Sequence, residues 1–128
     1  MRKFTCLFLL FFYVAHASGT KFTDVIDDVS LHFQTGNSKE LSKYFSTSMS
    51  IALRQDEGVY SKVQSEIILR EFFNRNSPES IEFVHRLDSN PNFRYVVLNL
   101  KTNSGLFRVS YKLVSEGSQY KMTELRIE

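Results

Sequence analysis

The most constraining feature of this sequence is the stretch from Gly58 to Phe73, which predicts a turn glycine, a short extended piece and then one helix. Ser61 is placed to cap the helix, and Gln64 three residues later can reach back to the N–H of the cap residue. The helix carries a broad apolar stripe at helical spacing, formed by Val63, Ile67, Ile68, Leu69, Phe72 and Phe73. Because such a stripe must be buried, we expect the helix to lie on strands that other parts of the chain supply.

Two helices are predicted ahead of this stretch, separated by a glycine. The first is expected over about residues 22–34, where apolar side chains recur at helical spacing, namely Phe22, Val25, Ile26, Val29 and Phe33. Thr20 or Thr23 is expected to cap it and Gly36 to end it. Asn37 is expected to cap a second, short helix, whose apolar side is formed by Leu41, Tyr44 and Phe45.

The rest of the chain predicts strands. Alternating residues indicate a strand over about 48–54, a turn at 55–58 and a short return strand at Val59 and Tyr60. After the helix breakers from Asn74 to Pro78, the apolar period changes from about 3.6 residues to 2. Four strands are predicted there, over 81–87, 95–100, 107–113 and 120–128. Helices followed by an antiparallel meander predict an α+β fold, with three helices on one face of a curved sheet.

The first residues carry the pattern of a secretory signal. Arg2 and Lys3 form a positive start, a run that is apolar apart from Thr5 extends from Phe4 to Val14, and Ala15-His16-Ala17 fits the small-x-small cleavage rule. The apolar run has 11 residues, whereas a membrane-spanning helix needs about 20. We therefore expect cleavage after about Ala17, one domain over residues 18–128, and a periplasmic or extracellular location. A retained anchor is the alternative.

Cleavage would also change the charge and the chemistry of the chain. Without Arg2 and Lys3 the 16 basic residues fall to 14, which balance 14 acidic residues. A neutral domain is a poor nucleic-acid binder, since that function needs a clustered basic surface. Cys6, the only cysteine, would be lost as well, and His32 and His85 would be the remaining histidines. No residues show the spacing of a metal site, so neither a metal nor a cofactor is expected.

The order of the predicted elements resembles the nuclear transport factor 2-like, or cystatin-like, cone. The chain is more closely similar to a family of short exported bacterial proteins of unknown function that carry this fold. The matching segments are Gly36–Leu41 with Tyr44 and Phe45, Gly58–Lys62 with Gln64, Phe72 with Phe73, and Leu125–Glu128. The resemblance implies a cone-shaped cavity between sheet and helices, a homodimer in many members, and functions that range from isomerases to binding modules.

His85 is the first candidate site residue. Strict alternation places it on one strand face with Ile81, Phe83 and Leu87. We therefore expect partial burial, and in a cone fold His85 could serve at the cavity as an acid, a base or a ligand donor. The alternative is a histidine near the strand end that is bonded to a neighbour or half exposed.

Three tyrosines, Tyr60, Tyr95 and Tyr111, are further candidates for the lining of a ligand cavity. Tyr111 is the best placed of them, because it lies on the apolar face of a clean alternation. The alternative for each is a core tyrosine whose hydroxyl reaches the rim of the sheet.

Carboxylates and basic residues give weaker signals. An isomerase of the ketosteroid type needs a carboxylate base in the cavity. Glu82 is expected on the face opposite His85, and Glu124 is expected to face away from the core because it adjoins Leu125. The basic strand positions Arg54, Arg108 and Lys112 predict a solvated face, since Asp56 and Glu57 lie close by.

These observations predict a non-enzymatic module that binds a small ligand or an envelope protein through its cavity or sheet face. The mature chain is expected to carry no membrane span, and a homodimer remains open. The alternative is an isomerase or dehydratase acting in the cone, which requires His85 to meet a second polar side chain there.

Overall fold

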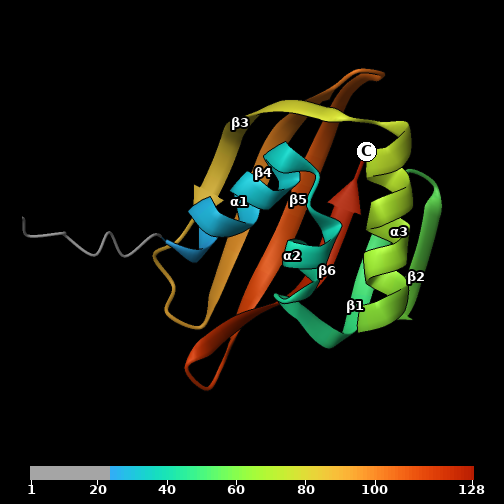
Figure 1. The fold of residues 1–128 in the computed structure, drawn as a ribbon. Coiled ribbons are helices and arrows are strands. Elements are labelled where there is room, and N and C mark those ends of the chain that lie inside the picture. Colours follow the sequence, from blue (N-terminus) through green and yellow to red (C-terminus); the bar gives the residue numbers. More distant parts are fainter. Residues whose placement is uncertain (1–23) are drawn as a thin grey trace, which may run out of the picture.

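The structure is a computed structural model that describes residues 24–128. These residues form three helices and six strands (Figure 1), in the order α1 (Val25–Thr35), α2 (Ser38–Ser42), β1 (Phe45–Leu53), β2 (Asp56–Ser61), α3 (Lys62–Arg75), β3 (Pro78–Leu87), β4 (Phe93–Thr102), β5 (Gly105–Glu116) and β6 (Gln119–Ile127). The predicted signal and the predicted cap residues Thr20 and Thr23 lie outside the described residues. No helix within 24–128 has the length and apolarity needed to cross a membrane.

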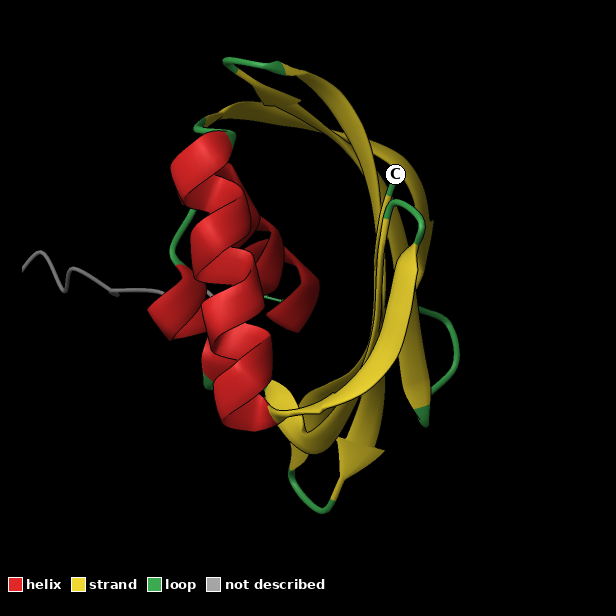
Figure 2. Ribbon diagram, turned by 90° about the vertical axis from the view of Figure 1, so that its right-hand side faces the viewer, coloured by secondary structure: helices red, strands yellow, loops and turns green. Residues whose placement is uncertain are grey.

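The six strands form one sheet in the order β2-β1-β6-β5-β4-β3. The β1–β6 pair is parallel and the other four pairs are antiparallel. Register shifts interrupt three of the pairings, and such irregularities bend strands. The sheet curls around the helices, which all lie on its concave side (Figure 2). The predicted α+β cone is therefore confirmed.

One hydrophobic core fills the space between helices and sheet. On β5 the apolar residues Phe107, Val109, Tyr111 and Leu113 are buried and point to the concave side, as their alternation predicts. The Phe33 ring of α1 stacks on Tyr111 at 5.6 Å between centroids, and Phe72 of α3 meets Phe107 edge-on at 5.1 Å. Aromatic pairs of this geometry connect the helices to the central strand.

The ends of the helices follow the predicted cap chemistry with one exception. Gly36 ends α1 in the left-handed region, at φ 65°, and Asn37 accepts from the N–H of Glu40 at the start of α2. At α3 the bonds are reciprocal, since Gln64 N–H donates to Ser61 Oγ and Ser61 N–H donates to Gln64 Oε1. At α1 the cap is Asp24, which accepts from the N–H of Ile26 at 3.1 Å. The prediction of a threonine cap was wrong, because the helix begins after Asp24.

The predicted stripe of α3 is only partly buried. Leu69, Phe72 and Phe73 are buried, but Val63 and Ile67 are 66% and 39% exposed. The helix contacts α2 as well as the β1–β2 hairpin, and these contacts leave the side that carries Val63 and Ile67 uncovered by residues 24–128. The second helix is also shorter than predicted: it ends at Ser42, and Phe45 is the first residue of β1.

The β1–β2 hairpin turns earlier than predicted. Its turn consists of Arg54 and Gln55, and Leu53 pairs with Asp56 across it. Gly58 is therefore a strand residue opposite Ile51 rather than a turn residue. A side chain at Gly58 would place its Cβ 2.7 Å from the Tyr60 hydroxyl oxygen. A larger residue at position 58 would therefore push away the Tyr60 ring that lies against its backbone.

Candidate functional site

His85 does not lie on the core face. Between Phe83 and His85 the β3–β4 register shifts by one residue, so that Phe83 pairs with Leu98 and His85 pairs with Val97. Val84 is the extra residue of this β-bulge, and a bulge of one residue reverses the face of every side chain that follows it. His85 is consequently exposed on the outer, convex face of the sheet. The expected partial burial was wrong, and Glu82 shares this outer face with His85 instead of opposing it.

The three candidate tyrosines point to three different places. Tyr111 is 1% exposed in the core, where its hydroxyl lies 2.8 Å from Ser30 Oγ and 3.3 Å from the carbonyl oxygen of Ile26. Burial raises the pKa of the Tyr111 hydroxyl above its ordinary value, and the bond with Ser30 offsets part of this effect. Tyr95 lies on the outer face, in register with Lys112. Tyr60 alone of the four candidates lines the larger hollow described next.

A hollow of about 770 Å³ lies between α3 and the β1–β2 hairpin, on the concave side. We call it the α3 groove. Its apolar lining comes from Ile51, Leu53, Tyr60, Ile68 and Phe72. Its polar lining comes from the hairpin turn and the last turns of α3, namely Arg54, Gln55, Asp56, Glu71, Arg75 and Asn76. Five apolar and six polar residues thus line the groove, so it offers both apolar surface and charged groups to a ligand.

The four charged residues of the α3 groove form no ion pairs with one another. All four are exposed, and none of the ion pairs within residues 24–128 includes Arg54, Asp56, Glu71 or Arg75. Arg54 is nevertheless held in place, because its guanidinium lies 5.2 Å from the centroid of the Phe107 ring. The sequence pattern predicted a solvated strand face for Arg54 and gave no role to Glu71 or Arg75. The i, i+4 spacing of Glu71 and Arg75 on α3 was the one available signal.

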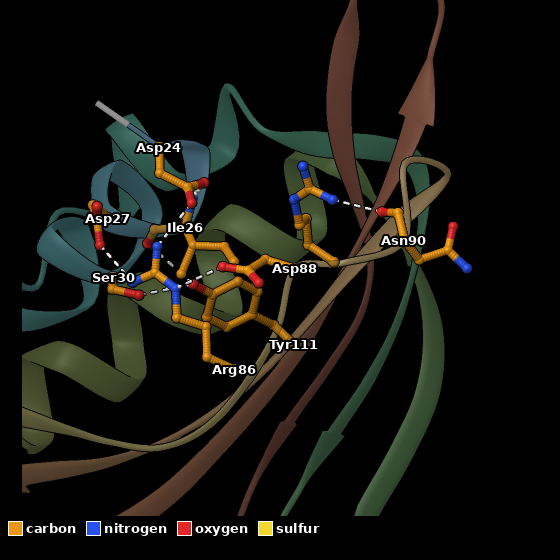
Figure 3. A network of polar contacts seen from close by, with 9 residues as sticks. Asp24, Ile26, Asp27, Ser30, Arg86, Asp88, Asn90 and Tyr111 are labelled. Carbon is orange, nitrogen blue, oxygen red and sulfur yellow. Dashed lines mark hydrogen bonds and ion pairs between the residues drawn. The ribbon is translucent and has the colours of Figure 1, made fainter. Parts of the chain in front are cut away.

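A second polar cluster joins α1 to the far edge of the sheet (Figure 3). Arg86 of β3 binds Asp27 at 2.7 Å and Asp24 at 2.8 Å, and Asp88 lies 3.5 Å from its Nε. Hydrogen bonds to Asp27 and then Asp24 raise the pKa of the Arg86 guanidinium. Partial burial disfavours the charge of Asp24, but the Ile26 N–H and Arg86 outweigh it and lower the pKa of this carboxyl. All three carboxylates pair with the same arginine, Arg86, so the cluster anchors α1 to β3.

The outer face of the sheet carries a smaller hollow of about 220 Å³. Tyr95, Lys112, Glu124 and Arg126 contribute to it, and Glu124 faces outward as predicted while Leu125 is buried. The side chains of residues 24–128 form no group of three or more His, Cys, Asp or Glu that could hold a metal ion. We therefore take the α3 groove as the candidate site.

Comparison with protein families gives one match. A profile of the domain of unknown function DUF4783 matches residues 26–128, which include every helix and strand of the structure except Val25, the first residue of α1. The chain belongs to the DUF4783 family. Among curated proteins none matches the chain.

Solved DUF4783 structures share this fold. A DUF4783 family protein from Bacteroides uniformis has 25% sequence identity and a TM-score of 0.78, over 82% of this chain and 96% of that chain. One from Bacteroides ovatus has 27% identity and a TM-score of 0.73, over 77% of this chain and 89% of that chain. An NTF2-like protein of unknown function from Cytophaga hutchinsonii has 9% identity and a TM-score of 0.57, over 80% of this chain and 84% of that chain. The predicted nuclear transport factor 2-like fold is thus confirmed for this DUF4783 chain.

Proposed function

We propose that this protein is a binding module whose α3 groove takes a small ligand with an apolar body. The observation that carries the proposal is the apolar lining of the groove, where Ile68, Leu53 and Tyr60 remain only partly covered by residues 24–128. Apolar surface that is left open in a hollow of this size favours a ligand that removes it from water. The volume of the groove, about 770 Å³, is within the range of pockets that take ligands of a few rings.

The enzymatic alternative has less support. It required His85 and a second polar side chain to converge in the cavity, and His85 lies on the outer face of the sheet. The polar groups of the α3 groove include two carboxylates, Asp56 and Glu71. Neither of them forms an ion pair within residues 24–128 that would couple it to a second charged group for proton transfer, and a binding role needs no such pair.

The test is titration with phenylnaphthylamine, an uncharged probe made of a naphthyl and a phenyl group, which becomes fluorescent in apolar surroundings. We expect saturable binding to the folded protein and NMR shifts of the methyl groups of Ile51, Leu53 and Ile68. Ile68→Lys should weaken binding because the charge enters the apolar lining. Ile67→Lys is the matched control, since the neighbouring Ile67 is exposed and does not line the groove. Equal binding by both variants, or shifts confined to the outer face, would contradict the proposal.

We also propose that the protein is exported and acts outside the cytoplasm. The support is the sequence pattern of Arg2, Lys3, the apolar run from Phe4 to Val14 and the small residues at Ala15 and Ala17. Intact-mass measurement of the protein from its native cells should show the loss of about 17 residues. A mature protein that retained the apolar run would be evidence for the anchor instead.

A further inference from the structure

Arg54 stands out in the backbone of the hairpin. It is the one non-glycine residue within 24–128 with a positive φ, at 55°. Glycine is usual at such a position in a two-residue turn, and another residue there costs about 1 kcal/mol or more. The strained backbone places an arginine at the edge of the α3 groove. Strain of this kind often marks a residue that is kept for what its side chain does.

The Arg54 side chain is positioned rather than free. Its guanidinium lies over the Phe107 ring, and that ring in turn packs edge-on against Phe72 at 5.1 Å. Phe72 lines the α3 groove. One continuous set of contacts therefore connects the cationic group to the apolar lining. Arg54 itself lines both the α3 groove and a neighbouring hollow of about 470 Å³ that Phe107 and Glu128 help to form. A guanidinium over an aromatic face keeps its N–H groups, which lie in the plane of the guanidinium, available for an oxygen anion.

Two of the carboxylates near the turn, Glu57 and Glu128, are engaged by another arginine. Arg126 binds both Glu57 and Glu128 at 3.1 Å, so these two acids are partnered on the outer side of the hairpin. Asp56 and Glu71 are the carboxylates that remain at the groove, and Arg75 is its second cation. The groove thus has no net charge, but Arg54 differs from its neighbours because an aromatic ring fixes its charged group. An anionic ligand would meet a guanidinium that is already held in place. A cationic ligand would have to immobilise the side chain of Asp56 or Glu71, which costs binding free energy.

We propose that the ligand of the α3 groove is an amphipathic organic anion, whose carboxylate, sulfonate or phosphate head binds the Arg54 guanidinium while its apolar body lies against Ile68 and Phe72. This inference rests on the proposed function, since it names the chemical class that the groove takes. Arginine forms paired N–H bonds to such oxygens, which add specificity for an anionic head. The body of the ligand supplies hydrophobic binding energy that does not depend on Arg54.

The experiment compares two probes that share one ring system. Anilinonaphthalene sulfonate carries the anionic head, and phenylnaphthylamine lacks it. Arg54→Gln should weaken binding of the sulfonate about tenfold, which is the usual effect of losing a charged hydrogen bond, and should weaken binding of the neutral probe far less. Asp56→Asn should strengthen binding of the sulfonate, because it removes a neighbouring negative charge. Arg108→Gln is the matched control, since Arg108 is exposed on the outer face opposite Asn99 and should change neither probe.

A second variant protects the test against misfolding. Arg54→Gly suits the positive φ of the turn and also lacks the guanidinium, so it should reproduce the loss for the sulfonate. Unchanged sulfonate binding in both variants would overturn the assignment of Arg54, and stronger binding of dodecylamine than of the sulfonate would assign the head to Asp56 or Glu71. If either of these results is obtained and the wild-type protein still binds the neutral probe, the proposed function stands without this inference. If wild-type protein binds neither probe, both proposals fail.

Discussion

The Tyr111 hydroxyl of β5 and the Ser30 hydroxyl of α1 lie 2.8 Å apart in the core, and both residues are 1% exposed. The same tyrosine oxygen donates to the carbonyl of Ile26. This pair is the polar connection between the first helix and the central strand. It explains why a tyrosine that was a candidate for the ligand cavity is part of the core.

We expect Tyr111→Phe to destabilise the fold by about 1–2 kcal/mol, because it leaves the buried Ser30 hydroxyl without its partner. Urea unfolding measures this loss. Ser30→Ala combined with Tyr111→Phe should cost less than the sum of the single changes, since the double variant leaves no orphaned hydroxyl between the two sites. Additive costs would show that the two hydroxyls do not interact.

The charge of Asp24 should make stability depend on pH. Its pKa is lowered in the folded state by the Ile26 N–H and by Arg86, so the carboxylate stabilises the fold above its ordinary pKa of about 4. This contribution is lost as the pH falls through the lower pKa of the folded state. Asp24→Asn removes the charge but keeps a side chain that caps a helix well.

We therefore expect Asp24→Asn to be less stable than the wild type at neutral pH, and the difference to shrink as the pH falls below about 4. Urea unfolding over a series of pH values measures both curves. Asp28→Asn is the control, because Asp28 lies in the same helical turn but forms none of the ion pairs within residues 24–128. A constant difference at all pH values would mean that Asp24 acts only as a cap.

The parts of the fold that the sequence predicted are those that short-range chemistry decides. Gly36, Asn37 and the pair Ser61–Gln64 act within one helical turn of their own positions, and all of them lie where the pattern placed them. The alternation on β5 is equally local. The bulge at Val84 is different, because its position depends on how β3 fits the curved surface of β4. No pattern in the strand itself marks it.

The candidate site was the least predictable part. Tyr60 was identified, but the α3 groove also needs a turn at Arg54 and the approach of α3 to that turn. The turn was misplaced because Gly58 suggested one, whereas the glycine accommodates the Tyr60 ring. His85 was assigned to the cavity by strict alternation, which one extra residue reverses. Both errors concern tertiary packing, on which single-strand patterns carry no information.

The capping box of α3 offers a direct measurement of local stabilisation. Ser61→Ala should destabilise the fold by about 1 kcal/mol, because the N–H of Gln64 loses its acceptor. Thermal or urea unfolding measures the change. Ser61→Asp is the matched control and should keep most of the stability, since aspartate is also a good cap. A loss of only a few tenths would mean that water replaces the cap at no cost.

The last prediction separates the two roles of Arg54. Its φ of 55° strains the backbone, whereas the contact of its guanidinium with the Phe107 ring stabilises the fold. Arg54→Gln and Arg54→Gly both lose the cation–π contact, but only glycine relieves the strain. We therefore expect the glycine variant to be more stable than the glutamine variant by about 1 kcal/mol. Urea unfolding of both variants measures the difference.

Gln55→Gly is the control, because Gln55 follows Arg54 in the turn without a positive φ, and there glycine should be neutral or destabilising. Equal stability of the two Arg54 variants would show that the turn relaxes once the arginine is removed, and that the side chain itself holds the backbone in this conformation.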